Sequence, residues 1–232
     1  MKNALGKFLM IVLSTAALLL PAAATAQKRI YTRSFKMQDF RSKTTKVVLG
    51  GSDVFNAALR QEVTSLWTVS PYEFCTPAEY EKQKNNPETY FLYTESSRGI
   101  VYLTLGRGGN DAANDAFKRP LTVVSIPVAG EADATGNTLQ YLPAFISIIQ
   151  DYADRAIDSE FAAYRGLGAI SKRIPADVTL ITDPEEASAA FTGCQPATAV
   201  RITITPSGRP EDKPRYRITF RTDTYEFYSL RK

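Results

Sequence analysis

The spacing of apolar residues changes several times along the chain between the period of a helix and that of a strand. In the first half, short β-rich runs alternate with two amphipathic segments of helical period. Ser52 or Asp53 is expected to cap the first helix, and the second is expected to begin at the capping box Thr76-Pro77-Ala78-Glu79. The pattern predicts strands at 46–49, 67–74, 90–94 and 100–105 and helices at 54–66 and 77–85. This alternation favours crossovers in a partly parallel sheet.

In the second half, a long helical stripe is followed by runs in which apolar and polar residues alternate. The pattern predicts strands at 121–128, 178–182, 200–205, 215–221 and 225–230 and helices at 139–161 and 184–192. The second of these helices is expected to be capped by Asp183-Pro184-Glu185-Glu186. The strict alternation in the last strands predicts an antiparallel meander with one packed and one wet face. The arginines expected on the wet face are Arg201, Arg215, Arg217 and Arg221. The predicted fold class is therefore α/β, a mixed sheet with βαβ crossovers in the N-terminal half and an antiparallel C-terminal meander.

The first 26 residues have the pattern of a secretory signal peptide. Lys2 and Lys7 precede an apolar run from Phe8 to Leu20. Ala24-Thr25-Ala26 is a small-x-small cleavage pattern. The run is shorter than the about 20 residues that span a bilayer, although a retained membrane anchor is the alternative. We expect a periplasmic or secreted protein that does not span the membrane after signal cleavage. The expected organisation is a signal peptide at 1–26, a basic N-terminal arm at 27–46 and a single α/β domain at 47–232.

The predicted arm concentrates positive charge. Seven basic residues stand there against one acid, Asp39. Such an arm can hold a protein near an anionic surface of the cell envelope. The alternative is a solvated, partly disordered N-terminal segment that binds no partner. Nucleic acid is not an expected partner, because the protein is expected to be exported.

The chain contains no histidine, and this absence restricts the chemistry that it can perform. It excludes Ser-His-Asp and Cys-His catalysis and nearly every familiar zinc or iron site. A carboxylate pair, a Ser–Lys dyad or a Ca²⁺ or Mg²⁺ site remains open. Asp111 and Asp115 lie in a glycine-containing polar loop, but their spacing differs from that of known calcium loops. No cofactor and no metal site are predicted.

A ligand site is expected where the N-terminal strands end. Gly51, Ser52 and Asp53 stand between a predicted strand and a helix, where exposed helix N–H groups can bind an anion. In an open α/β sheet, ligands bind beyond the carboxyl ends of the strands. The predicted ligand-binding residues are Gly51, Ser52, Asp53, Thr76, Glu95 and Ser96. The alternative is that the same residues form ordinary helix caps and turns.

Two cysteines, Cys75 and Cys194, are present. In an oxidising compartment they could form a disulfide, which across a loop of this length stabilises a fold. They could equally remain separate buried thiols.

The stretch Trp67-Thr68-Val69-Ser70-Pro71-Tyr72-Glu73-Phe74, with the capped helix at Thr76 and the run Tyr90-Phe91-Leu92, resembles an uncharacterised family of secreted or periplasmic proteins of Bacteroides-type bacteria. The resemblance implies export in a two-membrane bacterium, and it carries no known activity. The expected function is that of a non-catalytic protein of the cell envelope that binds a ligand or partner. The alternatives are a hydrolase that uses carboxylates or a divalent metal, and a structural component of an envelope assembly.

Overall fold

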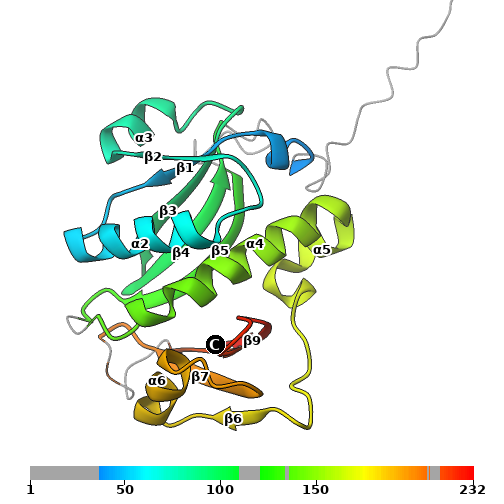
Figure 1. The fold of residues 1–232 in the computed structure, drawn as a ribbon. Helices are drawn as coiled ribbons and strands as arrows, with labels where there is room; N and C mark the ends of the chain where they lie inside the picture. Colours follow the sequence, from blue (N-terminus) through cyan, green and yellow to red (C-terminus); the bar gives the residue numbers. More distant parts are fainter. Residues whose placement is uncertain (1–36, 110–120, 134–135, 208, 210–214) are drawn as a thin grey trace, which may run out of the picture. The chain divides into compact units, whose positions relative to one another are not determined.

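Two β-sheets lie on either side of one long helix, α4 (Leu142–Asp158) (Figure 1). The computed structural model describes residues 37–109, 121–133, 136–207, 209 and 215–232. The predicted signal peptide, the first ten residues of the predicted arm and the Asp111–Asp115 loop lie outside these residues. The α/β class with mixed sheets is confirmed, since both sheets combine parallel and antiparallel strands.

The first sheet has five strands in the order β2-β1-β3-β4-β5. Its strands are β1 (Thr45–Val48), β2 (Tyr72–Cys75), β3 (Tyr90–Ser97), β4 (Ile100–Arg107) and β5 (Leu121–Gly130). β1 is parallel to both β2 and β3, and the connections run through α2 (Asp53–Leu66) and α3 (Pro77–Gln83). β3, β4 and β5 are antiparallel neighbours. The predicted crossovers are therefore present in the N-terminal half, as the alternation of patterns indicated.

The second sheet has four strands in the order β6-β7-β8-β9. Its strands are β6 (Thr179–Ile181), β7 (Thr198–Ile204), β8 (Tyr216–Arg221) and β9 (Phe227–Arg231). β7, β8 and β9 form the predicted antiparallel meander. β6 adds a parallel strand, because the helix α6 (Pro184–Thr192) carries the chain back to the start of the sheet. β6 pairs with β7 only as far as Val200, and this short pairing is important for the site described below.

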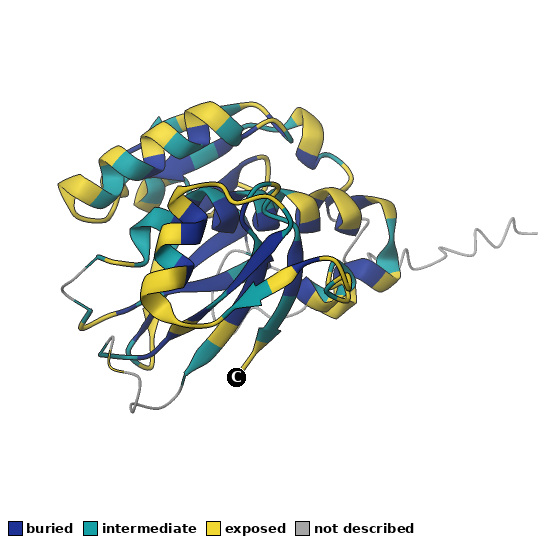
Figure 2. Ribbon diagram, turned by 60° about the horizontal axis from the view of Figure 1, so that its bottom comes forward, coloured by how far each residue is buried: buried dark blue, intermediate teal, exposed yellow. Residues whose placement is uncertain are grey.

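α4 has buried residues in every turn because sheets cover it from both sides, whereas Asp151, Asp154, Arg155 and Asp158 form an exposed strip. Apolar side chains from both sheets join those of α4 in a single core, and the described residues form one compact unit. On the side of the second sheet, Phe220 packs against Tyr141, Phe145 and Phe191 with ring centroids 5.7–6.3 Å apart. Figure 2 shows the result: the strands are buried over much of their length, and the exposed positions gather on the outer faces of the helices.

The single helix predicted at 139–161 is divided into shorter segments. A 3₁₀ turn, η3 (Leu139–Tyr141), precedes α4, and α5 (Glu160–Arg165) and the 3₁₀ turn η4 (Gly166–Ala169) follow it. Ser159 interrupts the stripe because its backbone is extended and its hydroxyl accepts a hydrogen bond from the Ala162 N–H at 3.2 Å. The serine therefore ends one helix and caps the next.

The folded unit begins earlier than the predicted boundary at residue 47. Met37 and Phe40 are fully buried, and a 3₁₀ turn, η2 (Phe40–Ser42), leads into β1. Arg41 forms ion pairs with Asp154 and Asp158 of α4, Lys43 with Glu88, and Lys46 with Glu73. Three of the seven basic residues of the predicted arm are therefore paired within the protein. The other four precede the described residues.

Candidate functional site

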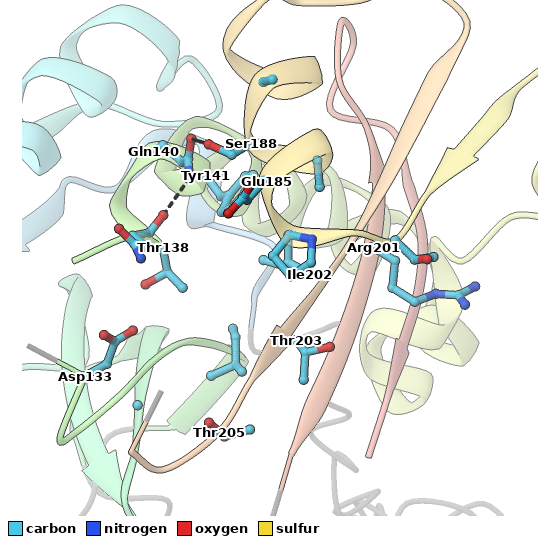
Figure 3. A pocket seen from close by; sticks show the side chains of 17 residues that line it. Asp133, Thr138, Gln140, Tyr141, Glu185, Ser188, Arg201, Ile202, Thr203 and Thr205 are labelled. Atoms are coloured by element: carbon cyan, nitrogen blue, oxygen red, sulfur yellow. Dashed lines mark hydrogen bonds between the residues drawn. The ribbon is translucent and has the colours of Figure 1, made fainter. Parts of the chain in front are cut away.

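A cavity of about 560 Å³ lies beside β7 (Figure 3). Three segments that are distant in the sequence line it: the end of β5 with the chain that leads to η3, the first turns of α6, and the last residues of β7 with Thr205. A volume of this size is within the range of small-molecule sites in proteins, about 300–1,000 Å³.

The position of the cavity follows from the parallel unit β6–α6–β7. Asp183 ends the loop after β6 and caps α6, and Pro184 occupies the first helical position, where no N–H is needed. The cavity thus lies at the carboxyl end of a parallel strand, where α/β proteins commonly bind ligands. Because β6 stops pairing at Val200, no described strand covers that edge of β7 from Arg201 to Ile204, and those residues line the cavity.

Buried apolar side chains form one wall of the cavity. Tyr141, Ile202 and Ile204 are nearly inaccessible to solvent and line it. The Tyr141 ring is held edge-on against Phe191 at 4.9 Å, and burial raises the pKa of its hydroxyl. This wall belongs to the central core, so its shape is fixed by the packing of α4 and α6.

Gln140 connects the two elements that face each other across the site. Its amide nitrogen donates a hydrogen bond to the Asn137 carbonyl at 2.8 Å, and its carbonyl oxygen accepts one from the Ser188 hydroxyl of α6 at 2.8 Å. Figure 3 shows Gln140 between these elements. The side chain of Gln140 therefore positions the lining rather than offering free polar groups.

Thr205 is the residue whose environment points most directly to a ligand. It lines the cavity and is only 2% exposed. Its hydroxyl has no hydrogen-bond partner among the described residues. A buried polar group without a partner costs about 1–3 kcal/mol, and native proteins contain few of them. A hydrogen-bonding group inside the cavity would remove this cost.

The charged residues of the lining are two carboxylates, Asp133 and Glu185, and one guanidinium, Arg201. Asp133 comes from the loop after β5 and Glu185 from the first turn of α6. Register pairs Arg201 with Thr219 of β8, and the Arg201 Nε donates to the Thr219 hydroxyl at 3.2 Å. By the alternation of a strand, the predicted arginines Arg215, Arg217 and Arg221 fall on the same face as Thr219 and Arg201. That face is not wet throughout, because Thr219 and Ala199 on it are fully buried.

A second hollow of about 490 Å³ lies between the Trp67–Val69 loop and α4 and is polar. Gln150 spans part of it with hydrogen bonds to the Thr68 N–H at 2.7 Å and the Leu66 carbonyl at 3.0 Å. Burial raises the pKa of Asp151 there. Asp154 is engaged by Arg41, so most of the charge and hydrogen-bonding capacity of this hollow is used within the protein.

The residues predicted as a ligand site at the first β–α turn act as caps. The Ser52 hydroxyl accepts a hydrogen bond from the Phe55 N–H at 3.3 Å, and the Gly51 N–H donates to the Asn56 side chain at 3.1 Å. Asp53 is the first residue of α2. A Cβ at Gly51 would lie 2.6 Å from the Phe55 ring, so the glycine is explained by packing. Neither described cavity includes these residues.

The hydroxyl and backbone N–H of Thr76 form the capping box that the sequence predicted. Its N–H donates to Glu79 Oε2 at 2.7 Å, and its hydroxyl accepts from the Glu79 N–H at 3.2 Å. The loops that contain Gly50 and Pro77 are neighbours, with 3.7 Å between a Cβ built at Gly50 and the Pro77 Cγ. The two turns are therefore neighbours, and neither of the described cavities lies between them.

Glu95 and Ser96 lie near the β3–β4 hairpin. Glu95 accepts a hydrogen bond from the Thr104 hydroxyl at 2.9 Å, and that hydroxyl is 2.8 Å from Ser125. Ser96 pairs with Val101 across the hairpin. Neither residue lines the cavity beside β7 or the hollow beside α4.

The disulfide that the sequence left open is not formed. Both cysteines are free, with Cys75 buried and Cys194 exposed. Cys75 ends β2 in the first sheet, whereas Cys194 follows α6 beside the second sheet. Burial raises the pKa of the Cys75 thiol.

One feature of the sequence points to the candidate site beside β7. The strand predicted at 178–182 is followed by the Asp183-Pro184 cap, and the rule applied to the N-terminal strands applies equally to this turn. No local pattern links that turn to the residues that complete the lining, which are Gly130, Asp133, Asn137, Thr138, Gln140 and Tyr141. Their approach depends on how the two sheets share α4.

Comparisons with protein-family models, with curated proteins and with solved structures found no match. None of the helices in the described ranges has the length and apolar character that crossing a membrane requires. Within the same ranges, Cys, Asp and Glu side chains form no group of three or more that could hold a metal ion.

Proposed function

We propose that the protein is a non-catalytic ligand-binding protein of the cell envelope, and that its ligand is a small polar molecule held in the cavity beside β7. The observation that carries the proposal is Thr205, a residue of the lining of a ligand-sized cavity whose buried hydroxyl has no hydrogen-bond partner in the described part of the chain. The location at the carboxyl end of β6 supports it, as do the mixed polar and apolar walls. The envelope location rests on the signal-peptide pattern of residues 1–26.

The proposal is tested by a thermal-shift screen of the purified protein against sugars, amino acids and nucleosides. A ligand that binds only the folded state raises Tm, and the increase grows with its concentration. Ala189 is an exposed residue of α6 that lines the cavity, so A189W fills the cavity with little expected effect on folding. Ala57 is an exposed residue of α2 outside the cavity, and A57W is the matched control.

We expect at least one compound to raise the Tm of the wild type and of A57W but not of A189W. If every compound that shifts the wild type also shifts A189W equally, ligand binding in this cavity is refuted.

A hydrolase that uses carboxylates is the second candidate, because Asp133 and Glu185 line the same cavity. Such a pair can supply a general acid and a base or nucleophile. Chromogenic glycosides and esters test this candidate. Turnover by the wild type that both D133N and E185Q abolish would make the protein an enzyme, and absence of turnover with retained binding supports the binding function.

A further inference from the structure

Five consecutive residues, Arg201–Thr205, line one side of the cavity beside β7 (Figure 3). Successive side chains of a strand point to opposite faces of its sheet, so no single face accounts for such a run. Burial follows this alternation, because Ile202 and Ile204 are buried whereas Thr203 between them is exposed. What consecutive residues of a strand share is the edge of its backbone. The cavity therefore meets the backbone edge of β7.

The pairing of β7 shows which main-chain groups lie on that edge. The Thr222 N–H, directly after β8, donates to the Thr198 carbonyl at 3.0 Å. In an antiparallel pair, successive residues direct their main-chain groups alternately toward the partner strand and away from it, and the register between β7 and β8 has no shift along β7. The even-numbered residues of β7 therefore face β8, and Arg201 and Thr203 face the side of β6.

That side is open beyond the end of β6, which pairs with β7 only as far as Val200. Within the described ranges, no hydrogen bond outside the strand ladders reaches the Arg201 carbonyl or the main-chain groups of Thr203. The edge thus presents a carbonyl, an N–H and a second carbonyl in succession. Thr205 follows directly and adds its buried hydroxyl, which has no partner in the same ranges.

The protein closes this open edge at both ends. β6 closes one end by its pairing with Val200. At the other end, just after β7, the Ala132 N–H donates to the Pro206 carbonyl at 3.1 Å. The strand residues left between these two points are Arg201–Ile204, which span about 13 Å of extended chain. The edge therefore has room for a short chain and not for a long one.

From these features we infer that the ligand is a short peptide of about four residues that binds in extended form and pairs its main chain with the open edge of β7. When a peptide adds a strand to a sheet edge, main-chain hydrogen bonds supply affinity and alternate side chains supply specificity. Peptide side chains on the inner face would meet Ile202 and Ile204, and those on the outer face would lie beside Thr203. This inference rests on the proposed binding function and specifies its ligand.

A peptide and its ester analogue test the inference. The peptide is acetyl-Thr-Val-Thr-Val-amide, which alternates polar and apolar side chains as the two faces of the edge require. In the analogue, ester links replace the amide links, so the side chains are kept and the N–H donors are lost. In isothermal titration of the purified protein, we expect the analogue to bind about tenfold or more weakly than the peptide, because the Arg201 and Thr203 carbonyls lose their donors. This comparison uses the wild type and needs no variant.

Position 203 provides a matched pair of variants. T203P removes the N–H that faces the cavity, and a proline is tolerated at a strand edge where the N–H makes no ladder hydrogen bond. T203A keeps that N–H and removes only the exposed side chain. We expect T203P to weaken peptide binding about tenfold or more, because its ring also occupies the edge, and T203A to weaken it less than about twofold.

The outcomes separate this inference from the proposed function. Failure of the peptide to bind, equal binding of the peptide and its ester analogue, equal effects of T203P and T203A, or undiminished peptide binding by A189W would overturn the peptide assignment. Ligand binding itself is judged by whether A189W abolishes the shifts found in the wider screen. A compound from that screen that loses its effect in A189W, with no binding of the peptide, refutes the inference and leaves the binding function in place.

Discussion

The β1–α2 turn and the β6–α6 turn have the same local design but different surroundings. In each, a strand ends, a polar residue caps a helix, and the first N–H groups are satisfied by that cap. At the first turn the neighbouring loop with Pro77 packs against Gly50, and the Gly51 N–H is bonded to Asn56. At the second turn, β6 is too short to cover β7, and a cavity remains. A cap alone therefore does not create a cavity; the space left opposite the cap does.

The strongest test of this comparison removes a side chain that packs behind the wall of the cavity. Phe220 is fully buried among Tyr141, Phe145 and Phe191, and Tyr141 lines the cavity. F220A should lower the free energy of unfolding by about 3–5 kcal/mol, as is typical of buried Phe-to-Ala changes. Because both sheets share one core, we expect one shifted urea transition and no separate early one, measured by far-UV circular dichroism.

Phe161 provides the control for that experiment. It is 70% exposed, so F161A should change the free energy of unfolding by less than about 0.5 kcal/mol. Two separated transitions in F220A, with the first sheet retaining its stability, would show that the sheets are independent and that the cavity belongs to the second sheet alone.

A smaller effect is expected where the two sheets approach each other at the cavity. A Cβ at Gly130 would lie 2.1 Å from the Thr205 carbonyl oxygen, and this backbone atom cannot turn aside as a side chain does. G130A should destabilise the protein by about 1–3 kcal/mol, the usual cost of overpacking, and should weaken ligand binding by displacing Thr205.

Gly168 is the matched control, because a Cβ there meets no atom within 4 Å. G168A should leave both the denaturation midpoint and the ligand-induced Tm increase unchanged. If G130A were as stable as the wild type and bound ligand equally well, the close approach of β5 and β7 would not determine the cavity.

Local sequence patterns were sufficient for most elements and for three helix caps. Ser52, the Thr76–Glu79 capping box and the Asp183-Pro184 start all act as predicted, because each involves residues within one helical turn. The break at Ser159 was missed because the apolar stripe continues across it, and only the backbone conformation reveals the new cap.

The candidate site was less predictable because it depends on contacts between distant segments. The carboxyl-end rule was applied to the turn after β1, where no described cavity lies, since the pattern cannot reveal the hydrogen bond from Gly51 to Asn56 or the approach of Pro77 to Gly50. It also cannot show that β6 pairs with only three residues of β7. Thr205 looks like any strand-end threonine in the sequence, and its unsatisfied hydroxyl becomes visible only after residues 130–141 are placed beside it.

Substitutions at Thr76 and Glu185 test the difference between the two turns, because the first should change only the stability of the protein and the second only its ligand binding. T76A removes the hydroxyl that accepts from the Glu79 N–H, so it should lower the free energy of unfolding by about 1 kcal/mol without changing ligand affinity. E185Q should leave the urea midpoint within experimental error while reducing affinity for a ligand held in the cavity beside β7. Loss of binding in T76A with full binding in E185Q would move the ligand site to the N-terminal turns.

The smallest expected effect is a pH dependence that belongs to the first sheet alone. Hydrogen bonds from the Thr76 N–H and hydroxyl lower the pKa of Glu79 below its ordinary value of 4.5. A carboxyl whose pKa is lower in the folded state than in the unfolded state stabilises the fold above the unfolded pKa, and this contribution disappears as pH falls through the folded pKa. The Tm difference between wild type and E79Q should therefore be full at neutral pH and should shrink below pH about 4.5. Ligand affinity measured at neutral pH should be the same in both proteins, because the capping box lies outside the cavity. A Tm difference that persists unchanged at the lowest pH would show that Glu79 stabilises α3 by packing and not through its ionised carboxylate.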